Sequence, residues 1–259
     1  MNYLRIFCSV SLTAGILGLM ACEKDDVAGL GEEKDKGKII FVNAAPNSAT
    51  VAAQAQREIA IFPFYNNVQF NLFPIKFPWS NGYKAFAPGT MTMRFDTAQS
   101  QANNPAGPAA KVAEVSFPIQ ADKYYSVYAI GTAQKVEIVV LDDNLALPAP
   151  GKAKVRLMNY SPDAGPIDIV ISGGATLGTS LKFKDVKDFF EIEPGTYTIQ
   201  LREAGTARVL ASKSNVFIDR NSCYSIWARG FRTTPSPGNS VSGQGLDISY
   251  HANRWSVPL

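Results

Sequence analysis

The chain has 259 residues, 46% of them hydrophobic and 18% charged, and its formal net charge is +3. This length fits one or two domains, and the hydrophobic content is sufficient for a buried core in each. The small net charge and the lack of any run of Lys and Arg argue against nucleic acid as a partner.

The first 21 residues have the pattern of a secretory signal. Arg5 is followed by an apolar run of about 15 residues, too short for a typical membrane span of about 20, which ends at Leu19-Met20-Ala21-Cys22. This end resembles a bacterial lipoprotein signal, which is cut before a cysteine whose sulfur carries a diacylglycerol. We therefore predict a signal peptide over 1–21 and lipidation at Cys22. The alternatives are an uncleaved helix and an ordinary secretory signal with a chance cysteine.

The residues after Cys22 favour an exported lipoprotein. Glu23-Lys24-Asp25-Asp26 resembles the acidic surface-export tag of lipoproteins in Bacteroidetes-type bacteria. The segment 22–37 is rich in Gly and charge and predicts a flexible tether. We expect an outer-membrane lipoprotein that contacts the membrane through its lipid anchor and is exposed on the cell surface, with a periplasm-facing position as the alternative.

The remaining chain repeats itself, because four sequence blocks recur in the same order. Each block of the first copy is followed here by its counterpart: Val42-Asn43-Ala44-Ala45-Pro46-Asn47 and Met158-Asn159-Tyr160-Ser161-Pro162-Asp163; Ala87-Pro88-Gly89-Thr90 and Glu193-Pro194-Gly195-Thr196; Tyr125-Ser126-Val127-Tyr128-Ala129-Ile130-Gly131 and Tyr224-Ser225-Ile226-Trp227-Ala228-Arg229-Gly230; Val136-Glu137-Ile138 and Leu246-Asp247-Ile248.

The periodicity of these blocks is that of strands. Alternating apolar residues follow each Pro-Gly-Thr, and the blocks 122–131 and 221–230 are almost continuously apolar, as in central strands. We predict an all-β fold of two tandem Ig-like β-sandwiches, over 38–144 and 152–259. The Pro-rich segment 145–151 predicts a short, fairly stiff linker.

The same residues resemble a known family. Leu141-Asp142-Asp143-Asn144, the run from Pro148 to Arg156, Asn159-Tyr160-Ser161-Pro162-Asp163 and Pro194-Gly195-Thr196-Tyr197 are similar to the domain of unknown function DUF4397. The resemblance is strongest over 152–230 and weaker over 38–144. It implies tandem Ig-like units on exported bacterial proteins, and it supplies no catalytic residues.

No group of residues predicts catalysis, a metal site or a cofactor. His251 is the only histidine and is expected to face solvent, and Cys223 has no histidine beside it and is expected to be a buried, inert thiol. With Cys8 removed in the signal and Cys22 acylated, Cys223 also has no disulfide partner. Asp142, Asp143 and Asn144 offer too few oxygens for calcium and suit a turn.

The segment 62–86 holds 9 of the 28 aromatic residues. The plain interpretation is that most of them pack in the first core or between the two sandwiches. The functional one concerns Phe77, Trp79 and Tyr83, which lie in a stretch with loop chemistry and could form a stacking platform for sugar rings or a peptide.

Two functions follow from these features. The first is a non-enzymatic surface lipoprotein that serves adhesion, ligand capture or envelope assembly, with a glycan or a protein as its ligand. The second is a carbohydrate-binding accessory lipoprotein of a glycan-uptake system that uses the aromatic loop near Trp79. An enzyme is disfavoured, because no paired carboxylates and no triad can be placed on any motif.

Overall fold

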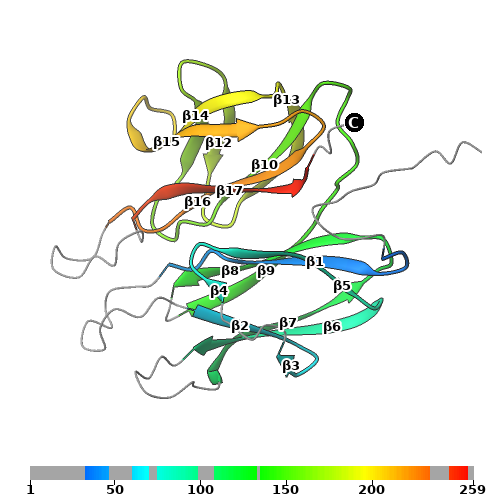
Figure 1. Cartoon of the computed structure of the whole chain (residues 1–259). Helices are drawn as coiled ribbons and strands as arrows, with labels where there is room; N and C mark the ends of the chain where they lie inside the picture. The colour runs from blue at the N-terminus through cyan, green and yellow to red at the C-terminus, as the bar shows by residue number, and fades with distance from the viewer. Residues whose placement is uncertain are drawn as a thin grey trace, which may run out of the picture.

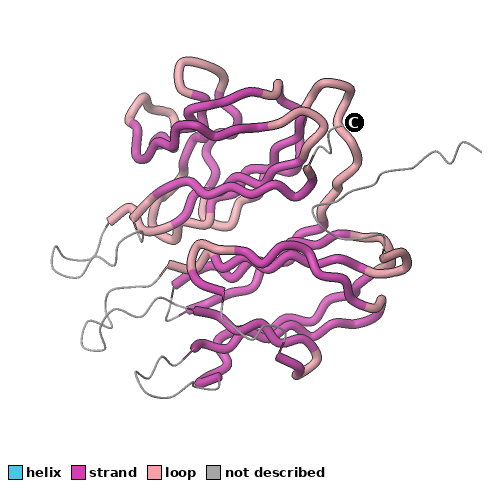
Figure 2. Tube along the Cα trace, in the orientation of Figure 1, coloured by secondary structure: helices cyan, strands magenta, loops and turns pink. Residues whose placement is uncertain are grey.

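The computed structural model describes residues 33–46, 60–69, 75–98, 108–132, 135–233 and 245–255. Throughout these residues the regular structure is β-strand, as the magenta segments in Figure 2 show. The all-β prediction is therefore confirmed. Within the same residues no helix is long and apolar enough to span a membrane.

The first unit consists of two facing sheets (Figure 1). One sheet has the order β5 (Ser80–Phe86), β1 (Gly37–Asn43), β8 (Tyr124–Thr132) and β9 (Lys135–Asp142). The other has the order β3 (Val68–Gln69), β2 (Ala60–Tyr65), β6 (Gly89–Ala98) and β7 (Pro108–Ile119), and β4 (Ile75–Lys76) also pairs with β2.

The second unit repeats this arrangement. One sheet has the order β13 (Val186–Ile192), β10 (Ala153–Asn159), β16 (Cys223–Arg229) and β17 (Asp247–Arg254). The other has the order β12 (Thr176–Leu181), β11 (Ile167–Ile171), β14 (Gly195–Glu203) and β15 (Val209–Ile218).

The strand order differs from that of an immunoglobulin domain. In the immunoglobulin sheets the first strand pairs with the second. Here the first strand of each unit lies inside its sheet and pairs in parallel with a strand near the end of the unit, β1 with β8 and β10 with β16. The predicted pair of sandwiches is thus present, but the order of the strands in each sheet differs from that of an immunoglobulin domain.

The repeated sequence blocks have the same structural roles in both units. Asn43 and Asn159 end the first strands, and each amide donates to a backbone carbonyl across the unit, Ile75 O at 3.0 Å and Leu181 O at 2.9 Å. The hydroxyls of the equivalent Tyr125 and Tyr224 each accept a backbone N–H at 3.1 Å. The repeat therefore preserves specific polar contacts as well as apolar spacing.

Each unit has its own apolar core between its two sheets. Side chains of alternating residues, such as Phe41 and Val127 in the first unit and Leu157 and Ile226 in the second, point into these cores. The alternation in strands sends every second residue to the opposite face.

A third core lies between the two units. It is built by the outward-facing residues of the sheets that contain β1 and β10, which lie against each other in Figure 1. Its buried apolar members are Ile40, Val42, Ala44, Tyr83, Tyr128, Ile130, Leu145, Met158, Tyr160, Cys223 and Trp227. Because their sheets are covered on both faces, the central strands β1 and β16 are buried at every residue, which explains their nearly continuous apolar sequence.

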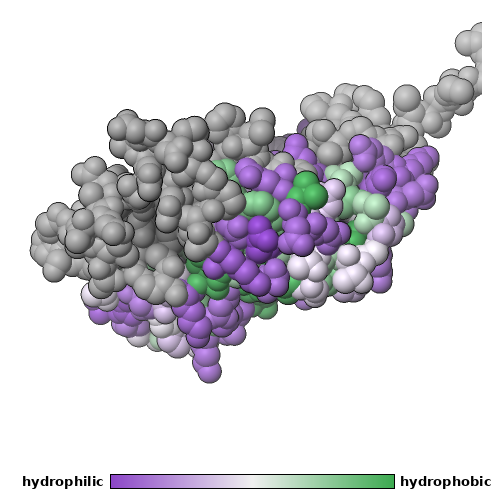
Figure 3. All heavy atoms as spheres, turned by 90° about the horizontal axis from the view of Figure 1, so that it is seen from below, coloured by the Kyte–Doolittle hydropathy of each residue, from purple (hydrophilic) through white to green (hydrophobic). Residues whose placement is uncertain are grey.

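The opposite face of the first unit is different in character. Figure 3 shows hydrophilic residues over much of the part that is coloured, with smaller hydrophobic areas between them. On this face Thr92 bonds Ser116 at 2.8 Å, and Arg94 bonds Asp96. The second unit therefore covers the outer face of the sheet that contains β1. The outer face of the sheet that contains β6 instead exposes polar groups.

Candidate functional site: a buried polar network between the two units

Strand alternation brings polar residues of both units to one place in the third core. Ser126 lies on β8, Arg156 on β10 and Ser225 on β16, each in the set of residues that faces the other unit. Ser126 and Ser225 occupy equivalent positions of the sequence repeat. The network is thus formed where equivalent faces of the two units meet.

The centre of this network is an ion pair between the units. Arg156 Nη1 of the second unit lies 2.7 Å from Asp143 Oδ1, and neither side chain is exposed. Asp143 follows β9 of the first unit, and its backbone N–H donates to Tyr124 O at 2.8 Å. The guanidinium also lies over the ring of Phe189, with Cζ 4.7 Å from the centroid. An ion pair with this degree of burial needs further hydrogen bonds to offset its desolvation.

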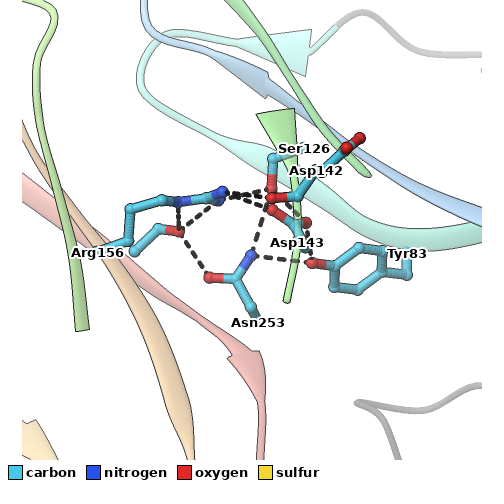
Figure 4. Close-up of polar contacts among 7 residues, drawn as sticks. Tyr83, Ser126, Asp142, Asp143, Arg156 and Asn253 are labelled. Carbon is cyan, nitrogen blue, oxygen red and sulfur yellow. Dashed lines mark hydrogen bonds and ion pairs between the residues drawn. The ribbon is translucent and has the colours of Figure 1, made fainter. Parts of the chain in front are cut away.

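Hydroxyl and amide groups supply those bonds, as Figure 4 shows. Tyr83 and Ser126 donate to Asp143 Oδ2 at 2.5 and 2.7 Å. Arg156 Nη2 donates to Ser126 Oγ at 3.1 Å and to Ser225 Oγ at 2.9 Å. Ser225 donates to Asn253 Oδ1 at 2.7 Å, and Asn253 Nδ2 donates to Tyr83 OH at 2.9 Å, which closes a ring of contacts between the units.

The protonation of the network is fixed by burial and by the central charges. Burial raises the pKa of Tyr83 well above its ordinary value, and the neighbouring Asp143 raises it further, so the phenol stays a donor. Burial is the largest single effect on the pKa of Arg156 and lowers it, but the charge and hydrogen bond of Asp143 together with the nearby Tyr128 and Tyr83 outweigh burial, and the pKa is raised overall. The network therefore keeps one cation opposite one carboxylate, which suits a structural connection.

An aromatic layer adjoins the network. Tyr128 packs against Tyr160 and Trp227, with ring centroids 5.0 and 5.8 Å apart. His251 of β17 stacks on Tyr128 with an interplanar angle of 19° and meets Trp227 edge-on at 5.3 Å. Both imidazole nitrogens are buried, so the expectation that His251 faces solvent is wrong. It faces the first unit because it alternates with Tyr250 and Ala252, which pack in the second core.

The expected platform of Phe77, Trp79 and Tyr83 does not form. Trp79 is 68% exposed, but Phe77 and Tyr83 are buried. Phe77 packs under Arg229 of the second unit, whose Cζ lies 5.3 Å from the ring centroid. Tyr83 is part of the network. The plain interpretation, in which most aromatics of this segment pack inside, holds for these two residues, and ligand binding by Trp79 remains a prediction.

The reason for this difference is a β-bulge. Asn81-Gly82 resembles a loop in sequence, yet it lies within β5, where the pairing with β1 shifts register between Ile40 and Val42. Asn81 Oδ1 accepts Phe41 N–H at 3.0 Å, and Gly82 has a φ of +69°. A bulge with a left-handed glycine redirects the strand without ending it, so Tyr83 turns toward the second unit.

The other predicted sites have mixed outcomes. Cys223 is buried in the third core, as expected, and burial raises the pKa of its thiol to about 11. Asp143 is more than the turn residue that was expected, since its carboxylate pairs with Arg156 of the second unit. The segment 145–151 links the two units and also contributes to the core between them, because Leu145 is buried there. Cys22 lies outside the described residues.

Sequence analysis missed Arg156, Ser126, Ser225 and Asn253. One signal could have found the first of them. Arg156 stands within the apolar run Val155 to Met158 of a predicted central strand, and a charge in such a position requires a buried partner. Asn253 gave no comparable signal, because 170 residues separate it from its partner Tyr83.

One family matches this chain. The sequence model described as "Domain of unknown function (DUF4397)" matches residues 37–170, just over half of the chain. The chain belongs to the DUF4397 family. The DUF4397 match covers the first unit, the linker and the first two strands of the second, including Tyr83, Asp143 and Arg156. It therefore confirms the resemblance, but over a different range from 152–230, where it was expected to be strongest.

No curated protein matches the chain. Among solved structures, the Bacillus anthracis TIE protein is 10% identical, with a TM-score of 0.22, and the alignment covers 75% of this chain and 34% of that one. The chain thus spans about a third of that protein.

Two structures from Bacteroides species are similarly distant. A putative cell adhesion protein from Bacteroides eggerthii is 10% identical, with a TM-score of 0.22 and coverage of 86% of this chain and 97% of that one. A structure titled "putative polysaccharide binding proteins (DUF1812)" from Bacteroides thetaiotaomicron is 9% identical, with a TM-score of 0.18 and coverage of 76% and 92%.

Proposed function

We propose that this protein is a non-enzymatic lipoprotein of the outer membrane that presents one end of a two-unit β body to a ligand or to another envelope component. The observation that carries this proposal is the position of Trp79 relative to the predicted anchor. The chain enters β1 at Gly37, beside the turn that joins β7 to β8, where Asp122 N–H donates to Lys36 O at 2.9 Å. At the opposite end of β1, Asn43 N–H donates to Trp79 O at 3.0 Å.

Gly37, where the described chain enters β1, and the exposed Trp79 therefore lie at opposite ends of this strand. The seven residues of β1 separate them by about 20 Å, at roughly 3.3 Å per residue. Arg229 of the second unit lies over Phe77, so the second unit reaches the same far end. A flexible tether that starts at Cys22 would join the body at the end opposite to Trp79, which would leave the end that carries Trp79 free to meet a ligand.

The titratable groups of the third core support a non-enzymatic role. The hydroxyls and charges of the network bond one another between two packed sheets, and their pKa shifts follow from burial and from the ion pair. Such shifts also occur in structural ion-pair networks, so they do not by themselves indicate catalysis.

Lipidation at Cys22 is the first test. Cells that express the wild-type protein are grown with a fatty-acid analogue, and incorporation is compared with that in Cys22→Ser. We expect labelling of the wild type and its complete loss in the variant. Equal labelling of both would contradict the anchor. Protease treatment of intact cells then distinguishes surface exposure, in which the body is cleaved, from the periplasm-facing alternative, in which it is protected.

Carbohydrate binding is the second candidate function, and the exposure of Trp79 favours it. The backbone of Trp79 is held at both polar atoms, because its N–H also donates to Lys76 O at 2.7 Å. An exposed indole on a backbone that is held in this way is suited to stack on a sugar ring. This role would make the protein an accessory of a glycan-uptake system.

A glycan array tests this candidate with residues 24–259 and two matched variants. Trp255 is a suitable control, since it is 52% exposed and directly follows Arg254, the residue of β17 that pairs with Cys223. We expect Trp79→Ala to abolish glycan binding and Trp255→Ala to retain it. Equal binding by both variants, or no binding by the wild type, would exclude Trp79 as a carbohydrate platform.

A further inference from the structure

The contact between the two units contains a histidine in an unusual setting. His251 lies on β17 opposite Ser225, and although the residue as a whole is only half-buried, its ring packs against Tyr128 of the first unit and Trp227 of the second. Among the described residues, neither imidazole nitrogen has a hydrogen-bond partner, although both are buried. A neutral imidazole can remain in such an aromatic layer, but a protonated one would place an unpaired charge there.

The titratable groups described around His251 do not include a free carboxylate that could balance that charge. From β10 the cation Arg156 acts on the ring, and from β8 Tyr128 stacks on it. Tyr160, which follows β10, packs on Tyr128, and burial raises the pKa of both phenols. The phenol of Tyr83 on β5 and the carboxylate of Asp143 after β9 are engaged with each other, and Asp143 also with Arg156. On β16 the thiol of Cys223 has a raised pKa.

Other charged groups of these strands form contacts of their own. On β17 itself, Asp247 pairs with Arg229, and Arg254 donates to Leu145 O at 2.9 Å. Glu137 of β9 pairs across the units with Lys184. Among the described groups that face His251, none is therefore a free carboxylate that could stabilise the protonated ring.

We propose that His251 makes the contact between the two units sensitive to acid, so that protonation of its ring separates the units while each β-sandwich stays folded. Opening exposes the imidazole to water, where it can accept a proton. The closed body resists protonation, and it therefore loses stability relative to the open one as the pH falls.

The direction and size of this effect follow from linkage. Burial and then the charge of Arg156 lower the pKa of His251 to about 3 in the closed body, and in water it is about 6.5. The open state thus binds more protons between these values, and the closed state is favoured as pH rises. The open-to-closed ratio should increase about tenfold at pH 5.5 and on the order of 100-fold at pH 4.5, relative to pH 7.5.

Cys223 provides the readout. It is the only thiol in residues 24–259 and is buried in the third core. Its labelling by a disulfide reagent that reacts in acid is followed from pH 7.5 to 4.5, with each rate divided by that of the unfolded chain in the same buffer. This correction removes the pH dependence of the thiol chemistry, so the ratio reports access to the interface.

Two kinds of variant complete the experiment. His251→Gln and His251→Phe remove the titration, and we expect both to show a nearly constant labelling ratio. A second probe, Val155→Cys in a Cys223→Ser background, lies in the core of the second unit and should stay protected at pH 4.5. Labelling that rises equally in wild type and in both His251 variants would overturn the proposal, as would equal exposure of the two probes or a wild-type ratio that does not rise.

Discussion

Replacing Arg156 with Met should lower the free energy of unfolding by about 3 to 5 kcal/mol, the usual cost of removing one partner from a buried ion pair. Arg156→Met leaves the unexposed carboxylate of Asp143 with only the hydroxyls of Tyr83 and Ser126. It also removes the donors that hold Ser225. Urea denaturation of residues 24–259, followed by circular dichroism, measures this loss.

Arg202 provides a matched control for this prediction. It lies in the outer sheet of the second unit, on β14, and its guanidinium bonds only the neighbouring Gln200 among the contacts identified for it. Arg202→Met should cost less than about 1 kcal/mol, as expected of a surface substitution. A similarly small cost for Arg156→Met would mean that water reaches Asp143 and that the ion pair contributes little.

The second large effect is expected at Trp227. Its side chain is 2% exposed and packs against Tyr128 of the first unit and against His251. Trp227→Ala should destabilise the protein by about 3 to 5 kcal/mol, because it removes a large buried side chain and leaves a cavity between the units. The same denaturation experiment measures the change.

The control for Trp227 is again a tryptophan. Trp255→Ala removes an indole that is 52% exposed and should cost less than about 1 kcal/mol. If the two variants lost equal stability, Trp227 would not be buried between the units, and the third core would lack its largest member.

The fold could be predicted from local patterns because those patterns have local causes. Alternation after Pro194-Gly195-Thr196 indicates a strand with one apolar face, and the recurrence of Tyr125-Ser126 as Tyr224-Ser225 indicates a repeated unit. The equivalent hydrogen bonds of Asn43 and Asn159 show that the sequence repeat is also a structural repeat.

The contact between the units could not be predicted in the same way. Tyr128 and Trp227 are recognisable as strand residues, but alternation does not reveal which surface covers the face opposite to their own core. Asp143 stands beside a Pro-rich segment whose composition is typical of an exposed linker. Its burial depends on Arg156 and on the packing of two complete sheets, which no local pattern encodes.

The loop near Trp79 illustrates a second limit. Asn81-Gly82 favours a turn in sequence, and only the pairing of β5 with β1 shows that it is a bulge inside a strand. The consequence for function is large, because the bulge places Tyr83 in the network and leaves Trp79 as the exposed aromatic among the described residues of this segment.

The most direct test of the account is a double-mutant cycle across the two units, with Asp143→Asn in the first, Arg156→Met in the second, and the two combined. If the residues form a desolvated ion pair, the double variant should be more stable than the sum of the single losses predicts, with a coupling of roughly 1 to 3 kcal/mol. Additive losses within about 0.5 kcal/mol would contradict the claim that this pair joins the two units into one body.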